Sequence, residues 1–338
     1  MGFVNRRSLI LSSLVLSACA PVVQEARPRD AAFTGPRLLD GAFTSFDGTR
    51  LPMQVWPAAG EPWAAIVGLH GMNDYANAFH LAAPVWAGHG VTTYAYDQRG
   101  FGRAPQRGVW AGPELMTEDL RVLTSLVRTR HPHALIAVAG ISMGGAVAIE
   151  AFASPRPPEA HRLVLLAPAV WGWSSQPLAY KTLLWIAAHA VPGMVLEPPE
   201  SVLKKIRATD NIEELRRMGR DRNLIWGARP DAIYGLVDLM ERASDEISRL
   251  VVPTLYLSGA RDEIITRKPT FAAVRSRSPA VRTAWYPDGW HLLLVDRQRE
   301  RVLGDVLAFL RDPAAPLPSG VGPILAGAAK GLATPPSS

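Results

Sequence analysis

The sequence lacks three features that would each point to a particular class of protein. Its 338 residues include one cysteine, Cys19, so no disulfide can form within the chain. The formal net charge of +6 is modest and the arginines are scattered, which argues against a nucleic-acid-binding protein. The apolar runs at residues 8–16 and 182–191 are too short to span a bilayer. The hydrophobic content of 48% is instead typical of a globular protein with a substantial core.

The N-terminus has the features of an export signal. Arg6 and Arg7 precede the apolar run at residues 8–16, as the charged region of a signal peptide precedes its apolar region. The stretch Leu16-Ser17-Ala18-Cys19 then resembles the lipobox of bacterial lipoproteins, in which the cysteine is lipidated before cleavage. We therefore predict a lipoprotein signal peptide at residues 1–18 and attachment to a membrane surface through lipidated Cys19. The alternative is an ordinary secretory signal in which the cysteine is incidental.

The residues after the predicted anchor indicate a location and a spacer. The residue after the cysteine is Ala20 and not an aspartate. Under the sorting rules for bacterial lipoproteins, this favours the outer membrane. We expect a protein of the bacterial cell envelope, lipid-anchored to the outer membrane and facing the periplasm. Residues 19–40 are polar, contain three prolines and show no apolar periodicity, so they are predicted to form a tether.

Strand-like and helix-like segments alternate over residues 41–169 and again over residues 248–311. This alternation predicts an α/β core with a mostly parallel, eight-stranded sheet and helices on both faces. Its first two strands flank Asp47-Gly48, a strong hairpin signal. No convincing buried strand appears at residues 170–247, which are predicted to form a helical cap over the strand ends. Residues 312–338 are rich in Pro, Ala, Gly and Ser and are predicted to be a disordered tail.

The stretch Gly140-Ile141-Ser142-Met143-Gly144 fits the pattern Gly-x-Ser-x-Gly. A buried strand precedes it and a helix of small apolar residues follows, which is the context of a nucleophile elbow. In such an elbow the serine lies in a strained turn, and its hydroxyl projects above the sheet. Glycines allow the strand and the helix to cross closely. We predict that Ser142 is a nucleophile, and the alternative is a serine that only caps the helix.

A serine hydroxyl is a poor nucleophile without a base and an orienting carboxylate. Asp262 and His291 each follow a late predicted strand, and the order Ser, Asp, His is that expected of an elbow-type triad. Glu263 is the alternative acid, and Asp288 is too close in sequence to His291 to be favoured. The histidines predicted to lie away from the site are His131, His133, His161 and His189.

The oxyanion of acyl transfer needs two backbone donors. The first is the N–H of Met143, directly after the nucleophile, and the second is the N–H of Met72, in the loop after the His70-Gly71 strand. His70 itself is predicted to brace this loop, and Asp97 is predicted to be structural.

Together these motifs resemble the monoacylglycerol lipase and lysophospholipase group of α/β-hydrolases over about residues 41–310. The matching stretches are His70-Gly71-Met72, Asp97–Gly102, Gly140–Gly144, Gly259–Asp262 and Trp290-His291. The resemblance implies an α/β-hydrolase fold with Ser142 as nucleophile, Asp262 as acid and His291 as base. It also implies Met72 and Met143 as the oxyanion donors. One departure is Ala104, which stands where the group usually has a serine.

The chemistry implied by this resemblance is ester hydrolysis through an acyl-enzyme, with no metal or organic cofactor. The apolar residues of the predicted cap favour a lipidic ester as substrate, although packing over the sheet edge would also explain them. Two alternatives remain: an esterase for small soluble esters, and a non-catalytic envelope lipoprotein with the same fold. The sequence does not indicate how many copies of the chain assemble.

Overall fold

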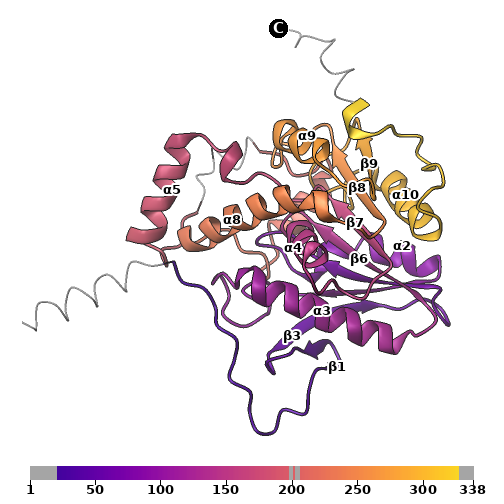
Figure 1. Cartoon of the computed structure of the whole chain (residues 1–338), viewed down its shortest axis with the longest axis horizontal. Helices are drawn as coiled ribbons and strands as arrows, with labels where there is room; N and C mark the ends of the chain where they lie inside the picture. The colour runs from indigo at the N-terminus through magenta and orange to yellow at the C-terminus, as the bar shows by residue number, and fades with distance from the viewer. Residues whose placement is uncertain (1–20, 198–200, 202–205, 327–338) are drawn as a thin grey trace, which may run out of the picture.

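A nine-stranded sheet organises the chain in the computed structural model, which describes residues 21–197, 201 and 206–326 (Figure 1). The predicted signal peptide and Cys19 lie outside the described residues. The strand order is β1-β2-β3-β5-β4-β6-β7-β8-β9. The strands are β1 (Arg37–Leu39), β2 (Ala42–Thr44), β3 (Arg50–Trp56), β4 (Ala64–Leu69), β5 (Val91–Tyr96), β6 (Leu135–Ile141), β7 (Arg162–Leu166), β8 (Thr254–Gly259) and β9 (Val281–Tyr286).

The strands from β4 to β9 run parallel, whereas β1, β2 and β3 form an antiparallel edge next to β5. The predicted hairpin at Asp47-Gly48 is confirmed, because β2 and β3 pair with Phe43 opposite Leu51. The predicted count of eight strands missed β1, a three-residue strand that pairs with β2. Strands β4, β5 and β6 are buried on both faces, which explains their nearly unbroken runs of apolar and small residues.

Helices cover both faces of the sheet (Figure 1). Helices α3, α4, α8 and α9 pack on one face, and η1, α2 and α10 pack on the other. The helical segments of the core and the cap are η1 (Ala76–Phe79), α2 (Ala82–Gly88), α3 (Gly112–Arg130), α4 (Met143–Ala153), η2 (Trp173–Ser175), α5 (Leu178–Ala190), α7 (Ile212–Met218), α8 (Pro230–Glu246), η3 (Ile247–Arg249), α9 (Arg267–Arg275) and α10 (Arg299–Arg311). No helix in the described ranges combines the length and the apolar character needed to cross a membrane.

Helix α3 illustrates how the sequence specifies a covering helix. Its buried apolar positions recur at helical spacing, at Met116, Leu120, Leu123 and Val127. Pro113 occupies the first turn, where its missing N–H costs nothing. Basic residues in the last turn complement the negative end of the helix dipole.

The insertion between β7 and β8 contains η2, α5, α7, α8 and η3, and no named strand lies in its described part. Helix α8 packs against α4 as well as α5, and Val237, Leu239 and Ala243 are buried in the main core. The predicted cap boundary at residue 247 is therefore too late, because α8 belongs to the layer that covers the sheet. The part of the insertion that projects from this layer comes before Pro230, the first residue of α8.

Both ends of the described chain depart from the predicted tether and tail. Val23 forms a parallel bridge with Trp110, and Gln24 is buried against the core. These contacts and β1 show that residues 19–40 are not a free tether where the structure describes them. The tail prediction is wrong up to residue 326, because Leu317 and Ile324 are buried and so anchor the proline-rich segment. Residues 327–338 lie outside the description.

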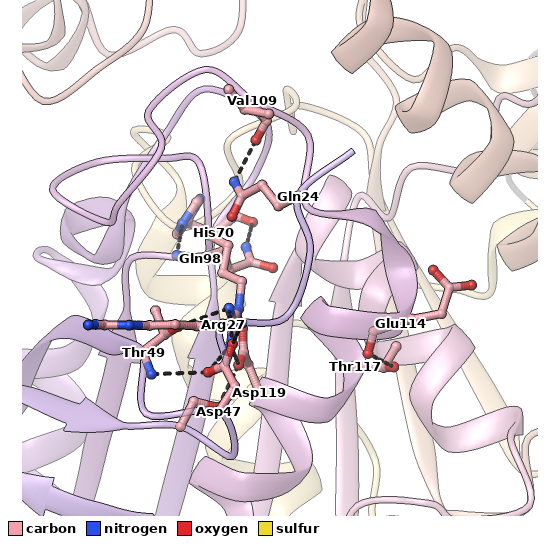
Figure 2. Close-up of polar contacts among 12 residues, drawn as sticks. Gln24, Arg27, Asp47, Thr49, His70, Gln98, Val109, Glu114, Thr117 and Asp119 are labelled. Atoms are coloured by element: carbon pink, nitrogen blue, oxygen red, sulfur yellow. Dashed lines mark hydrogen bonds and ion pairs between the residues drawn. The ribbon is translucent and has the colours of Figure 1, made fainter. Parts of the chain in front are cut away.

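A buried arginine joins the antiparallel edge to the rest of the core. The guanidinium of Arg99, in the loop after β5, donates to both oxygens of Asp47 at 2.8 and 2.9 Å. It also donates to both oxygens of Asp119 at 2.6 and 2.8 Å. Figure 2 shows Asp47 and Asp119 close together beside Thr49. Burial alone raises the pKa of Asp47, but hydrogen bonds from Arg99, Arg27 N–H and Thr49 N–H hold it well below its usual range.

Arg99→Ala tests how much this ion cluster stabilises the fold. The substitution leaves two buried carboxylates without their cation, so we expect the free energy of unfolding to fall by about 3–5 kcal/mol. Urea denaturation measures the change. The control is Arg156→Ala, which removes an exposed ion pair with Glu118 and is expected to cost no more than about 1 kcal/mol. Equal losses in the two variants would contradict a structural role for the cluster.

Candidate active site

Ser142 lies in the turn between β6 and α4 with φ +50° and ψ −116°. A positive φ strains any residue other than glycine, so the surrounding structure must hold this turn. Three backbone N–H groups do so by donating to the Ser142 carbonyl: Gly145 at 2.9 Å, Ala146 at 3.1 Å and Ala169 at 3.0 Å. The serine is therefore part of a nucleophile elbow and not a simple helix cap, since its side chain makes no cap hydrogen bond.

The elbow depends on close backbone contacts that only glycine allows. A Cβ atom at Gly140 would lie 2.5 Å from the Gly144 carbonyl oxygen. A Cβ atom at Gly144 would lie 2.5 Å from the Leu69 carbonyl oxygen, at the end of β4. Helix α4 therefore crosses tightly over two strands, and its free N-terminal end begins directly after the serine.

Asp262 and His291 are brought together from the loops after β8 and β9. Nδ1 of His291 donates to Oδ2 of Asp262 at 2.8 Å, since the carboxylate oxygen is the acceptor of this pair. The other oxygen of Asp262 accepts from the N–H groups of Ile264 and Ile265, both at 2.8 Å. These bonds fix the carboxylate and leave Nε2 of His291 as the nitrogen that can accept a proton.

The backbone at the end of β8 explains why these two loops meet. The N–H of Arg261 donates to the Gly289 carbonyl at 2.9 Å. A Cβ atom at Gly259 would lie 2.3 Å from the same carbonyl oxygen, so a side chain there would separate the loops. Glycine at position 259 thus permits the contact that orients His291.

Ser142 and His291 line one cavity of about 220 Å³. Gly71 and Met72, from the loop after β4, form part of its wall, and a Cβ atom at Gly71 would lie 3.3 Å from the Ser142 Cβ. No hydrogen bond from the N–H of Met72 or of Met143 to another described residue is found. Two backbone donors are thus free beside the serine, as an oxyanion site requires.

His70 braces the loop that carries Met72. Its Nδ1 donates to the Gly71 carbonyl at 2.7 Å, and its Nε2 accepts from the Gln98 N–H at 2.9 Å. Figure 2 shows His70 beside Gln98. Burial lowers the pKa of His70 to about 4, so the ring is neutral at pH 7 and fits these two bonds. His70 is therefore a positioning residue, as its place in the sequence predicts.

Most of the chain matches the sequence profile of one known protein family. The profile of the Hydrolase_4 family, described as serine aminopeptidase S33, matches residues 60–298. The chain belongs to this family. The predicted α/β-hydrolase fold is confirmed by this match and by strong likeness to solved lipases and esterases.

Relatives within this fold include two curated lipases. The chain is 25% identical over 272 residues to a monoacylglycerol lipase from Mycolicibacterium smegmatis, covering 80% of this chain and 95% of the relative. It is 26% identical over 256 residues to a monoglyceride lipase from Rattus norvegicus, covering 73% and 81%. The solved structure of a soluble variant of monoglyceride lipase from Saccharomyces cerevisiae has a TM-score of 0.67 at 18% identity, over 85% of this chain and 98% of that one.

The other candidates from the sequence lie outside the site. Asp97 is fully buried and accepts from Ala76 N–H at 3.0 Å and from Arg103 N–H and Nε at 2.9 Å, which is a structural role. Glu263 accepts from the Arg207 N–H, so it faces the cap segment. Ala104 is buried in the main core and is not part of the cavity wall, so its effect on substrate choice stays a prediction.

The cap reaches both catalytic loops. The N–H of Ile225 donates to the Asn73 carbonyl at 3.0 Å, next to Met72. The N–H of Leu292, next to His291, donates to the Ala208 carbonyl at 2.9 Å. The cap therefore contributes the apolar wall of the cavity, through Ala208, Met218, Leu224, Ile225 and Trp226.

Asp74 is a residue of the cavity wall that the sequence reasoning missed. It lies two residues after Met72, and its Oδ1 accepts from the Tyr75 N–H at 2.8 Å. The pKa of Asp74 is raised to about 7, mainly by burial and to a smaller degree by the carboxylates of Asp221 and Glu214, while the Tyr75 N–H and Arg217 oppose the shift. The signal that could have found it is its position, since it is the first acidic residue after His70-Gly71.

Asp74→Asn tests this titration. The native state keeps a proton that the unfolded state releases near pH 3.8, so wild-type stability falls as pH rises toward 7. Asparagine cannot ionise, so the variant is expected to gain stability relative to wild type by up to about 1.4 kcal/mol per pH unit across this range. Urea denaturation of both proteins at pH 5 and pH 8 measures the difference. If the free energies of unfolding of the two proteins differ by the same amount at pH 5 and at pH 8, a raised pKa of Asp74 is ruled out.

Proposed function

We propose that this protein is a serine hydrolase that cleaves carboxylic esters with an apolar acyl chain, such as monoacylglycerols or lysophospholipids. The observation that carries the proposal is the shared cavity of Ser142 and His291, with His291 held by Asp262 at 2.8 Å. An activated serine that opens into an apolar cavity suits the attack on a lipidic ester. The two curated relatives named as lipases of monoacylglycerol and monoglyceride support this substrate class.

The geometry supports a two-step acyl transfer. Nε2 of His291 takes the proton of the Ser142 hydroxyl while the serine oxygen attacks the ester carbonyl. The N–H groups of Met72 and Met143 stabilise the resulting oxyanion. His291 then protonates the leaving alcohol, and a water molecule releases the acyl group by the reverse route. These steps use only groups of the protein and water.

A graded ester panel tests the proposal. We expect kcat/KM to rise with acyl length from p-nitrophenyl acetate to p-nitrophenyl palmitate, and monooleoylglycerol to be cleaved, because longer chains bury more apolar surface in the cavity. Ser142→Ala is expected to lower kcat by about 10⁴-fold or more and to abolish labelling by a fluorophosphonate probe. An aminoacyl naphthylamide, included because of the family description, should not be cleaved.

The other outcomes of this panel identify the alternatives. A preference for acetyl or butyryl esters would indicate an esterase for small soluble substrates. A folded wild type that neither reacts with the probe nor cleaves any ester would indicate a non-catalytic lipoprotein.

We also propose that the enzyme is lipid-anchored through Cys19 in the bacterial cell envelope, at the outer membrane facing the periplasm. The support is the lipobox-like stretch Leu16–Cys19, which contains the only cysteine of the sequence. Stable anchoring needs more than one acyl chain, as a lipoprotein cysteine provides.

Cys19→Ser tests the anchor. Without the thiol no diacylglyceryl group can be attached, so fatty-acid labelling of the protein in cells should be lost. Cell fractionation after metabolic labelling with a radioactive fatty acid measures this, and Ser142→Ala serves as a control that keeps the label. Labelling that persists in Cys19→Ser would mean that the anchor is elsewhere or absent.

A further inference from the structure

The N-terminal segment at residues 22–27 is docked along the enzyme. The Val22 N–H donates to Oδ2 of Asp231 at 3.3 Å, and the Gln24 N–H donates to the Trp110 carbonyl at 2.8 Å. Farther along, the Arg27 N–H donates to Oδ2 of Asp47 at 2.9 Å. We call residues 22–27 the N-terminal strap, because these bonds reach from the start of α8 to the ion cluster of the sheet edge.

Gln24 is the most firmly held residue of the strap. It is buried, and its side-chain Nε2 donates to the Val109 carbonyl at 2.8 Å, as Figure 2 shows. Val23 is bridged to Trp110, and a Cβ atom at Gly112 would lie 3.1 Å from its Cγ1. Main-chain and side-chain contacts together therefore fix where the chain reaches the enzyme.

The strap brings the proposed lipid anchor beside the cap. Cys19 precedes Pro21 by two residues, so even an extended chain separates them by only roughly 7 Å. Asp231, which holds Val22, also donates its N–H to the Pro192 carbonyl at 3.4 Å, just after α5. In Figure 1 the described chain starts next to the ends of α5 and α8. The acyl chains would thus leave the protein near the end of α5.

Helix α5 carries a large exposed apolar surface at this place. Leu184 and Ala188 face the protein, whereas Leu183 and Ile186 are 67% and 50% exposed. We define the α5 apolar face as the exposed helix residues Leu178, Leu183, Trp185 and Ile186 together with Met194 and Val195, which follow the helix. An exposed apolar patch of this kind marks a binding surface in a soluble domain.

The chemistry of this face favours a lipid surface. Residues 177–196 contain no Asp or Glu, and Lys181 is their only Lys or Arg residue, so nothing there repels anionic headgroups. Helix α5 has 13 residues, too few to span a bilayer but sufficient for a helix that lies in the interface. A surface tethered within a few residues of an acyl anchor meets the membrane at high effective concentration.

We propose that the α5 apolar face inserts into the same membrane leaflet as the acyl chains of Cys19, and that the N-terminal strap sets this orientation. The inference rests on the lipid anchor proposed above. Two attachments at one end of the molecule hold the cap against the lipid surface.

The test uses the lipidated protein with one introduced cysteine. In a lipidated chain the sulfur of Cys19 is a thioether, so a maleimide probe reacts only with the new thiol. Ile186→Cys is labelled with an environment-sensitive fluorophore and reconstituted into vesicles of phosphatidylethanolamine and phosphatidylglycerol. The control is Val251→Cys, which is 83% exposed and lies between η3 and β8, outside the α5 apolar face. Hydrolysis of p-nitrophenyl acetate checks that both variants are folded.

We expect one label per chain, with emission from position 186 shifted to shorter wavelength and quenched by nitroxide-labelled lipids, and no such change at position 251. Equal emission and equal quenching at both positions, with one label per chain, would overturn the docking proposal alone. A shift without lipid quenching would also overturn it, and would indicate contact between copies of the protein. Two labels per chain would show that Cys19 is not lipidated, which overturns the anchor and the shared leaflet together.

A second variant tests the strap itself. A ten-residue Gly-Ser insertion between Ala20 and Pro21 frees the anchor from the cap and is expected to reduce lipid quenching at position 186. Unchanged quenching would mean that the strap does not set the orientation.

Discussion

The strained turn at Ser142 is the constraint on which the site depends. A serine with φ +50° persists only because three N–H groups bind its carbonyl and because α4 crosses the sheet at glycine contacts. The same crossing places the end of β4 against the elbow, and so brings Gly71 next to the serine. Strand β6 at the centre of a parallel sheet supplies the rigid base for this turn. The positions of the proposed nucleophile and of one proposed oxyanion donor are therefore consequences of a single backbone crossing.

A second set of backbone contacts holds Asp262 and His291, the proposed acid and base, and a buried ion cluster holds the edge of the sheet. The bond from the Arg261 N–H to the Gly289 carbonyl joins the loop of Asp262 to the loop of His291, and the cap contacts the same two loops through Arg207 and Ala208. Arg99 performs the corresponding task at the sheet edge, where it joins the hairpin turn to α3. Asp47 also accepts from the Arg27 N–H, so the same ion cluster holds the end of the N-terminal strap.

Much of the fold and of the site could be predicted because the signals are local. The elbow pattern, the hairpin at Asp47-Gly48 and the apolar strands each depend on neighbouring residues, whose backbone preferences act over a few positions. The predictions that were wrong depend on distant partners. The tail is held by Ile324 and the tether by Gln24, and composition alone does not reveal that an apolar or amide side chain finds a site elsewhere on the surface. The end of the cap was predicted too late for the same reason, because the packing of α8 on α4 assigns that helix to the core.

The sequence by itself determined which residues are proposed as nucleophile, acid and base, because Ser142, Asp262 and His291 each follow a strand and a parallel sheet brings its strand ends to one edge. Only the tertiary structure decided what surrounds them. It placed Asp74 in the cavity, where removal of water raises the pKa to about 7, although nothing in the local sequence specifies burial. It also placed the N-terminal strap against the start of α8, because hydrogen bonds to Asp231 and Trp110 join segments that are far apart in the chain.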